Sequence, residues 1–275
     1  RASLSEIPDV CVVNTCSVTD AADHKDRQAI NQLHRKYPAA IIIVTGCYAQ
    51  LQPEQISHIP GVDYVLGQNE KYDIPALIDE IEKRKGKDIN ENKIRVAAIR
   101  EIDDFHGVHS ADDRTRCFIK VQDGCNYFCT YCTIPYARGK SRNPKIEVIV
   151  KDAQLALDQG AKELIITGVN IGDFGKTTGE SFFDLVKALD DVEGIERYRI
   201  SSIEPNLLTD EIIEYVAQSR AFMPHFHIPL QSGCDEVLSE LDHRSTYGCP
   251  YCKRSGLHLV KTLREGLCFL LGIVH

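Results

Sequence analysis

Short apolar runs alternate with segments of helical periodicity along most of this chain. Apolar runs bounded by turn residues are typical of buried strands, and apolar repeats at i, i+3, i+4 and i+7 are typical of amphipathic helices. In the first part, strands are predicted at residues 10–14, 40–45 and 64–66. Helices are predicted from Thr19 or Asp20 to Tyr37, from Pro53, and from Ile74 to Lys85. This alternation favours an α/β fold with a small, doubly wound sheet.

The second part repeats the alternation. Strands are predicted at residues 117–122, 163–167, 198–201 and 225–228. Helices are predicted from Pro144, over residues 182–189 and 210–218, and from near Asp235. Four successive strand–helix units predict the beginning of a parallel (β/α) barrel, a fold whose active sites lie at the carboxyl ends of the strands.

Changes in composition divide the chain. We assign residues 1–85 to an N-terminal domain, 86–114 to an interdomain segment, 115–243 to an incomplete barrel and 244–275 to a tail of unknown role. A strand is expected at residues 94–99, and a short apolar helix-like stretch from Leu257. A barrel that stops at residue 243 is expected to leave its last strand with an open edge.

Composition narrows the class of protein. Apolar residues make up 43% and charged residues 26%, which is ordinary for a globular protein. A net charge of −8 argues against a basic surface for nonspecific nucleic-acid binding, although a local basic site remains compatible with it. No signal peptide or membrane-spanning run is present. The eleven cysteines are therefore interpreted as reduced and metal-binding, in a cytoplasmic protein.

Three cysteines form a compact run directly after one predicted strand. Cys125, Cys129 and Cys132 have the spacing Cys-x3-Cys-x2-Cys. Cysteine thiolates are the usual ligands of iron–sulfur clusters, and three of them leave one iron of a [4Fe–4S] cluster free to bind a small molecule. The alternative interpretation is three buried or zinc-binding cysteines. The spacing is that of the radical S-adenosylmethionine (SAM) enzymes, which predicts cleavage of SAM at this cluster.

Two further cysteines follow strands of the first part. Cys16 and Cys47 each lie just past the carboxyl end of a predicted strand, at the edge where ligands bind in open α/β sheets. Spacing alone leaves two interpretations open, a pair of metal ligands or two buried core cysteines.

Taken together, the two parts resemble the radical SAM methylthiotransferases. The resemblance covers about residues 8–242 and includes Asn14-Thr15-Cys16-Ser17-Val18-Thr19, Thr45-Gly46-Cys47-Tyr48-Ala49-Gln50, the three-cysteine run, and His227-Ile228-Pro229-Leu230-Gln231-Ser232-Gly233. The sequence is most similar to the branch that acts on N6-threonylcarbamoyladenosine beside the tRNA anticodon. Sister branches act on isopentenyladenosine in tRNA or on an aspartate of a ribosomal protein.

The resemblance implies two [4Fe–4S] clusters and two uses of SAM. Cys125, Cys129 and Cys132 would hold the radical SAM cluster, and Cys16 and Cys47 would hold the second cluster with a third cysteine expected before residue 1. One SAM methylates a sulfur at the second cluster, and the other yields the radical that removes hydrogen from C2 of the adenine. The implied partners are a tRNA substrate, a sulfur donor and a low-potential electron donor, with no membrane.

Other residues have less specific signals. Gly168, Asn170 and Gln231 are candidates for SAM contacts, with ordinary loop turns as the alternative. A run without acidic residues follows the cysteines and is a candidate for tRNA phosphate contacts, or else a solvated basic face: Arg138, Lys140, Arg142 and Lys145.

After His243 the resemblance ends. We therefore expect low or no activity from this polypeptide alone, which keeps an inactive iron–sulfur or tRNA-binding fragment as the alternative to an enzyme.

Overall fold

The computed structural model describes residues 7–17, 19–83, 93–102, 104–107, 116–229, 231 and the backbone of 268–272. The chain forms two compact units. The first comprises Arg1–Asp104 and Cys132–Gly139, and the second comprises Phe105–Tyr131 and Lys140–His275. A short segment that begins with Cys132, the last cysteine of the run, thus folds with the first unit. The domain limits proposed from composition stay predictions.

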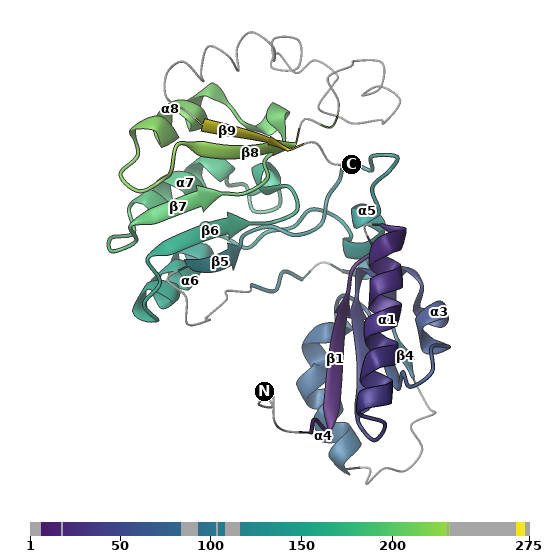
Figure 1. The fold of residues 1–275 in the computed structure, drawn as a ribbon. Coiled ribbons are helices and arrows are strands. Elements are labelled where there is room, and N and C mark those ends of the chain that lie inside the picture. Colours follow the sequence, from purple (N-terminus) through teal and green to yellow (C-terminus); the bar gives the residue numbers. More distant parts are fainter. Residues whose placement is uncertain are drawn as a thin grey trace. The chain divides into compact units, whose positions relative to one another are not determined.

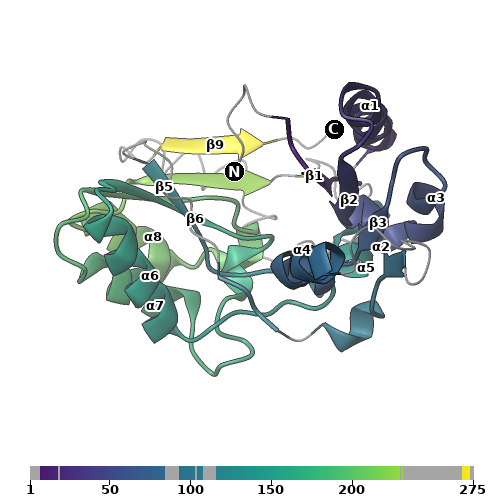
Figure 2. The same cartoon turned by 90° about the horizontal axis from the view of Figure 1, so that it is seen from below.

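The first unit contains a parallel four-stranded sheet in the order β1-β2-β3-β4 (Figure 1 labels β1 and β4, and Figure 2 labels β2 and β3). Its strands are β1 (Val10–Thr15), β2 (Ile41–Gly46), β3 (Tyr64–Leu66) and β4 (Ile94–Arg95). The strand expected at residues 94–99 is wrong beyond Arg95, because side chains bind the backbone there instead of a neighbouring strand. Glu70 accepts from the Ala97 N–H at 3.1 Å, and Gln50 donates to the Ala97 carbonyl at 3.0 Å.

Helices cover both faces of this sheet. The helical elements are α1 (Asp20–Lys36), α2 (Cys47–Leu51), α3 (Pro53–Ser57), η1 (Glu70–Asp73), α4 (Ile74–Lys83), η2 (Ile99–Glu101) and α5 (Ile134–Arg138). On one face, Ile30 of α1 and Tyr48 of α2 pack against Ile42 and Val44. On the other face, Leu77 of α4 packs against Ile43. The doubly wound arrangement is therefore confirmed, although the sequence did not predict α2.

The second unit also has a parallel sheet, in the order β5-β6-β7 (Figure 1). Its strands are β5 (Arg116–Lys120), β6 (Glu163–Thr167) and β7 (Arg197–Ile200). Strands β8 (His225–Pro229) and β9 (Cys268–Gly272) form a parallel pair of their own. Isolated bridges from Tyr198 to Phe222 and from Ser202 to His227 connect the two sheets.

Strand β9 corrects two expectations about the end of the chain. The edge of β8 is paired along His225–Pro229, so the expectation of an open edge there is wrong. Residues 268–272 are a strand, whereas a helix-like tail was expected. The physical reason is that the uninterrupted apolar run has no polar helical face and suits a strand with partners. The helix expected near Asp235 and the start of the tail lie outside the described residues.

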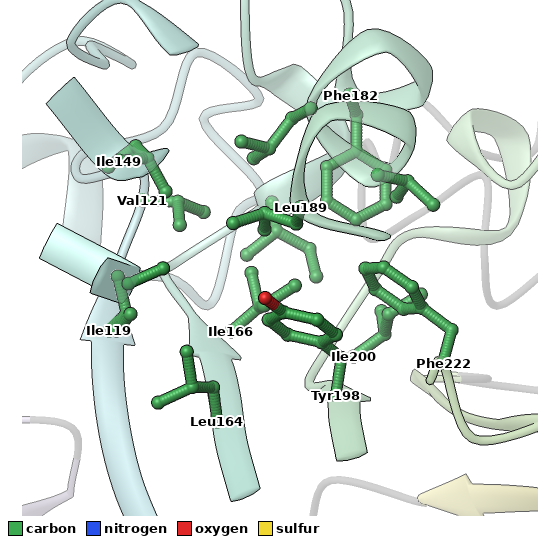
Figure 3. Close-up of a cluster of buried hydrophobic side chains, with 14 of the residues drawn as sticks. Ile119, Val121, Ile149, Leu164, Ile166, Phe182, Leu189, Tyr198, Ile200 and Phe222 are labelled. Atoms are coloured by element: carbon green, nitrogen blue, oxygen red, sulfur yellow. The ribbon is translucent and has the colours of Figure 1, made fainter. Parts of the chain in front are cut away.

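Three helices lie on one face of the β5–β6–β7 sheet, as Figure 2 shows. They are α6 (Ile146–Asp158), α7 (Phe182–Asp190) and α8 (Asp210–Gln218), with short helices η3 (Ile171–Asp173) and η4 (Pro205–Leu207) in the loops. Figure 3 shows the core between sheet and helices, where Tyr198 stacks on Phe222 with ring centroids 4.8 Å apart. No helix in the described ranges is long and apolar enough to cross a membrane.

Helix α6 begins at Ile146 and not at Pro144 as expected. The Asn143 side chain does not cap the helix. It donates to the Pro144 carbonyl at 2.9 Å and accepts from the Thr177 hydroxyl at 2.9 Å. The Glu180 carboxylate takes over as acceptor for the Ile146 N–H at 3.2 Å. A distant acidic side chain therefore caps this helix.

Glu163 lies on the sheet face opposite the helices, with its side chain 4% exposed. It pairs with Arg199 at 2.5 Å, Arg197 at 3.2 Å and Arg116 at 3.5 Å. Arg116, Glu163 and Arg197 are direct cross-strand neighbours, so the strand register places the charges together. Burial raises the pKa of Glu163, but the hydrogen bond and charge of Arg199 and the charges of its other partners outweigh burial, and the pKa is lowered.

We predict that Glu163→Gln lowers the free energy of unfolding at pH 7 by about 1–3 kcal/mol, since the three arginines lose their common anion. The lowered pKa stabilises the fold above the unfolded glutamate pKa of about 4.3, and this contribution disappears as pH falls through the folded value. Urea unfolding of the wild type and the Glu163→Gln variant at several pH values measures this contribution. Glu196→Gln removes an exposed partner of Lys162 and is the control. Equal losses in the two variants would contradict the prediction.

Candidate functional site

The fully buried side chain of Gln122 joins three loops at the carboxyl edge of the second unit's sheet. Its carbonyl oxygen accepts from the backbone N–H groups of Val169 and Asn170, both at 2.9 Å. Its amide nitrogen donates to the Gly124 carbonyl at 2.7 Å and the Ser141 hydroxyl at 2.9 Å, and also to the Asp123 carbonyl at 3.0 Å. One amide therefore fixes the start of the cysteine loop against the loop that follows β6.

The cysteine loop begins where this network ends. Gly124 has φ +71° and Phe128 has φ +52°, so the backbone adopts the left-handed conformation at one residue before Cys125 and at one residue after it. The sulfur of Cys125 accepts from the Tyr127 N–H at 3.5 Å. Cys125 and Cys129 are 9% and 8% exposed, which places two of the three thiols in a protected part of the loop.

The boundary between the compact units falls inside the cysteine run. Cys125 and Cys129 belong to the second unit, whereas Cys132 is the first residue of the segment that folds with the first unit. Within the described ranges, no three His, Cys, Asp or Glu side chains are gathered as metal ligands would be.

Several polar atoms at the same edge are buried without a hydrogen-bond partner. They include both amide atoms of Asn170 and Oδ2 of Asp173 after β6, and the Ser201 hydroxyl after β7. An unpaired buried polar group costs about 1–3 kcal/mol, so such a cluster favours a polar ligand that would pair with it.

Tyr127 brings the cysteine loop to this polar cluster. Its hydroxyl accepts from the Asn206 amide at 2.9 Å. Burial raises the pKa of Tyr127 to about 12, and the negative charges of Asp173 and Glu204 contribute to the shift. The phenol is therefore neutral at physiological pH, beside two carboxyl groups at the strand ends.

The three predicted SAM residues differ in what the structure gives them. Asn170 has the buried unpaired amide. A Cβ on Gly168 would lie 2.9 Å from the backbone carbonyl oxygen of Gln122, so this glycine permits the close loop packing around Gln122. Gln231 has φ +58°, a left-handed backbone after β8. A SAM contact stays a prediction for all three.

In the first unit, strand register places Cys16 and Cys47 together at one sheet edge. Thr15 pairs with Gly46, so each cysteine follows one member of the same cross-strand pair. A Cβ on Gly46 would lie 2.2 Å from the Thr15 carbonyl oxygen, and Gly46 has φ +103°, so only glycine allows this approach. The Thr15 hydroxyl also donates to the Thr45 carbonyl at 2.5 Å.

The two cysteines have different surroundings. Cys16 is exposed, and its backbone N–H donates to the Asp26 carboxylate at 2.8 Å. Cys47 is 4% exposed. Its sulfur accepts hydrogen bonds from Arg138 Nε at 3.5 Å and Gln68 Nε2 at 3.6 Å.

The four basic residues after the cysteine run are divided between buried pairs and the surface. Arg138 contacts Cys47, and Arg142 pairs with the buried Asp123 at 3.3 Å. Lys140 and Lys145 are exposed. An RNA contact stays a prediction for this group, and it fits the two exposed lysines best.

The donor sets fit iron–sulfur chemistry. Cysteine thiols in loops that follow strands are the ligand type that such clusters use. Cys47 in addition has two N–H donors on its sulfur, the kind of neighbouring partner that orients a metal ligand.

Comparison with known families covers both units. Residues 2–67 match the uncharacterized protein family UPF0004, and residues 119–248 match the Radical SAM superfamily. The chain is 41% identical over 249 residues to a threonylcarbamoyladenosine tRNA methylthiotransferase of Bacillus subtilis, covering 90% of this chain and 54% of that protein. The chain belongs to the radical SAM methylthiotransferase family. The resemblance drawn from the motifs is thereby confirmed.

Two further proteins are similar to this chain over most of its length and over little more than half of their own. A threonylcarbamoyladenosine tRNA methylthiotransferase of Aquifex aeolicus is 38% identical, with 89% of this chain and 59% of that protein covered. A tRNA-2-methylthio-N(6)-dimethylallyladenosine synthase of Finegoldia magna is 31% identical, with 97% and 58% covered. The chain thus spans slightly more than half the length of these methylthiotransferases.

Among solved structures, a radical SAM methyltransferase from Kitasatospora setae, TsrM, has a TM-score of 0.67 to this chain. It is 15% identical and covers 98% of this chain and 57% of its own, so the similarity concerns the fold. The parallel α/β architecture expected for a radical SAM methylthiotransferase is thus confirmed.

Sequence motifs alone missed the residues that support the cysteines. The strand pattern places Gln122 only at the end of a strand, and no motif includes Gln68 or Asp26. The one sequence signal for Gln122 is a polar residue directly after an apolar strand. Because its partners are backbone groups of distant loops, only the folded chain reveals its role.

We predict that Gln122→Leu lowers the free energy of unfolding by about 2–3 kcal/mol, because it leaves backbone groups of two buried loops without partners. Urea unfolding monitored by circular dichroism measures the loss. Gln154→Leu is the matched control, since Gln154 lies exposed on α6 and donates to Asp158 in the same helix. A loss in Gln122→Leu no greater than in the control would refute this role.

Proposed function

We propose that this chain is a radical SAM methylthiotransferase unit that adds a methylthio group to C2 of N6-threonylcarbamoyladenosine in tRNA. The observation that carries the proposal is the placement of two cysteine sets after the carboxyl ends of parallel strands, one after β1 and β2 and the other in the loop after β5. The 41% identity to a threonylcarbamoyladenosine tRNA methylthiotransferase supports the choice of substrate.

Cys125, Cys129 and Cys132 would hold the radical SAM cluster. Such a cluster supplies the electron that cleaves SAM to a carbon radical able to abstract hydrogen. The low exposure of Cys125 and Cys129 keeps water from this part of the site, and the Tyr127 N–H donates to the Cys125 sulfur. The Gln122 network holds the loop rigid, so that the thiols are oriented before the cluster binds.

The unpaired polar atoms beside the cysteine loop support a SAM site. The amide of Asn170 and the hydroxyl of Ser201 would pair with the polar groups of SAM. Asp173 has one carboxylate oxygen paired with Lys176 and the other buried without a partner. Together with Glu204, Asp173 provides negative charge for the cationic ammonium and sulfonium of that cofactor.

Cys16 and Cys47 would supply two thiolates to the second cluster, which would provide the site for the sulfur that is transferred. The Thr15–Gly46 pairing fixes the spacing of the two strand ends that present them. A second cluster separates the methylthiotransferases from radical SAM enzymes with a single cluster, so this pair narrows the reaction class.

Dimethylallyladenosine is the second candidate substrate. The 31% identity to a tRNA-2-methylthio-N(6)-dimethylallyladenosine synthase supports it less strongly than the 41% identity supports threonylcarbamoyladenosine. The chain reconstituted anaerobically with iron and sulfide is given SAM, dithionite and tRNA that carries either modification. Mass spectrometry of the nucleosides then identifies the base that gains a methylthio group. Product on dimethylallyladenosine alone would overturn the proposed substrate.

We predict that Cys129→Ala abolishes formation of 5′-deoxyadenosine from SAM, because the radical SAM cluster then lacks one of its three thiolate ligands. Liquid chromatography of the reaction measures the product. Cys117→Ala is the matched control, since Cys117 is a buried core residue of β5. Cleavage that survives in Cys129→Ala, or is lost equally in both variants, would refute the ligand assignment.

We predict that Lys140→Gln/Lys145→Gln weakens tRNA binding and lowers the slope of log K against log salt by about 1 for each phosphate that is no longer bound. Both lysines are exposed, so their replacement leaves the fold intact. Filter binding at several salt concentrations measures the slope. Lys151→Gln, which removes an exposed lysine of α6, is the control and keeps the wild-type slope. An unchanged slope in the double variant would exclude these phosphate interactions.

A further inference from the structure

Arg138 ends the short helix α5, in the segment that folds with the first unit. Two contacts attach this segment to the edge that carries Cys16 and Cys47. The Thr133 hydroxyl donates to the Ser17 carbonyl at 3.1 Å, and α5 packs against α2, the helix that begins at Cys47. Arg138 is therefore held at a defined position.

The guanidinium of Arg138 faces the Cys47 sulfur, with Nε and Sγ 3.5 Å apart. A second donor, Gln68 Nε2, lies 3.6 Å from the same sulfur. Lys71 Nζ donates to Gln68 Oε1 at 2.7 Å, which keeps the amide nitrogen directed toward Cys47. One buried sulfur thus has two N–H donors, and one of these carries a full positive charge.

This environment differs from that of a core cysteine. Cys11 lies in β1 with 8% exposure, and burial raises the pKa of its thiol. Cys47 is buried more deeply, at 4% exposure, yet it has a cation and an amide within hydrogen-bond distance of sulfur. Two directed N–H donors orient the Cys47 sulfur, which apolar packing around a core cysteine does not do.

We propose that Arg138 is a positioning residue for the Cys47 thiolate of the second iron–sulfur cluster, and that it does not bind RNA phosphate. The inference rests on the proposed function, since it takes Cys47 as a ligand of that cluster. Hydrogen bonds to ligand sulfur withdraw negative charge and raise the reduction potential of a cluster. Arg138 thereby sets the potential of the second cluster from a segment that begins with Cys132.

The test uses the full chain with Cys125→Ala, Cys129→Ala and Cys132→Ala, so that any iron reports on the second cluster alone. Iron and sulfide are added with an excess of a small thiol, which takes the place of the third ligand expected before residue 1. In this background, Arg138→Gln is expected to lower affinity for iron about 10- to 100-fold, as the loss of a partner of a metal ligand typically does. Its midpoint potential, followed by electron paramagnetic resonance, is expected to become more negative. Arg138→Lys keeps the charge and is expected to lie between Arg138→Gln and the unsubstituted residue.

Lys140→Gln is the matched control, because it removes one positive charge from the same stretch at an exposed position. It is expected to leave iron content and potential unchanged while tRNA binding weakens. Arg138→Gln is expected to change iron content and potential and to leave tRNA binding unchanged. Equal iron and equal potential in Arg138→Gln and its parent would overturn the inference alone. A parent chain that binds no iron through Cys16 and Cys47 would overturn the proposed function together with the inference.

A second measurement needs no cluster. The iron-free chain is unfolded in urea as wild type, Arg138→Gln, Cys47→Ala and the double variant. Interaction between the two side chains predicts that the shifts in the urea midpoint are not additive. Additive shifts would show that Arg138 and Cys47 do not interact, and would refute the positioning role whatever the chain binds.

Discussion

A single buried amide determines how the carboxyl edge of the second unit is organised. Gln122 has no access to water, so each of its donors and acceptors needs a partner within the protein. The loops after β5 and β6 and the segment at Ser141 supply these partners. Since a partly satisfied network would be worse than none, the loops take their positions together or not at all. The geometry of the cysteine loop is a consequence of this constraint.

In the first unit, backbone packing and not a buried side chain fixes the positions of the loops that carry the cysteines. Gly46 brings the end of β2 against Thr15 so closely that no Cβ fits between them. The two cysteines that follow are thus set by strand pairing itself. Both sites rest on parallel strands, because the carboxyl ends of such strands collect at one edge and bring distant loops together.

Sequence periodicity predicted the strands and helices of the cores well, because burial imposes a clear repeat on them. Helix α1, capped by Thr19, and helix α8, capped by Thr209, were predicted close to their observed bounds. Predictions failed where contacts between residues distant in sequence determine the secondary structure. Glu180 determines the first residue of α6, and pairing with β8 determines that Cys268–Gly272 is a strand. The motifs located the candidate ligands, but not Gln122 or Gln68, whose roles depend on backbone and sulfur atoms far away in sequence.

The segment Cys132–Gly139 has a consequence for how the protein is made. It completes the first unit, yet residues 105–131, which belong to the second unit, precede it in the chain. The surface of α2 that receives α5 therefore stays uncovered during synthesis until the ribosome has passed residue 139. Neither unit is continuous in sequence, so no single cut in the polypeptide separates them into two complete pieces. The two units therefore depend on one continuous polypeptide for their completion, although their hydrophobic cores are distinct.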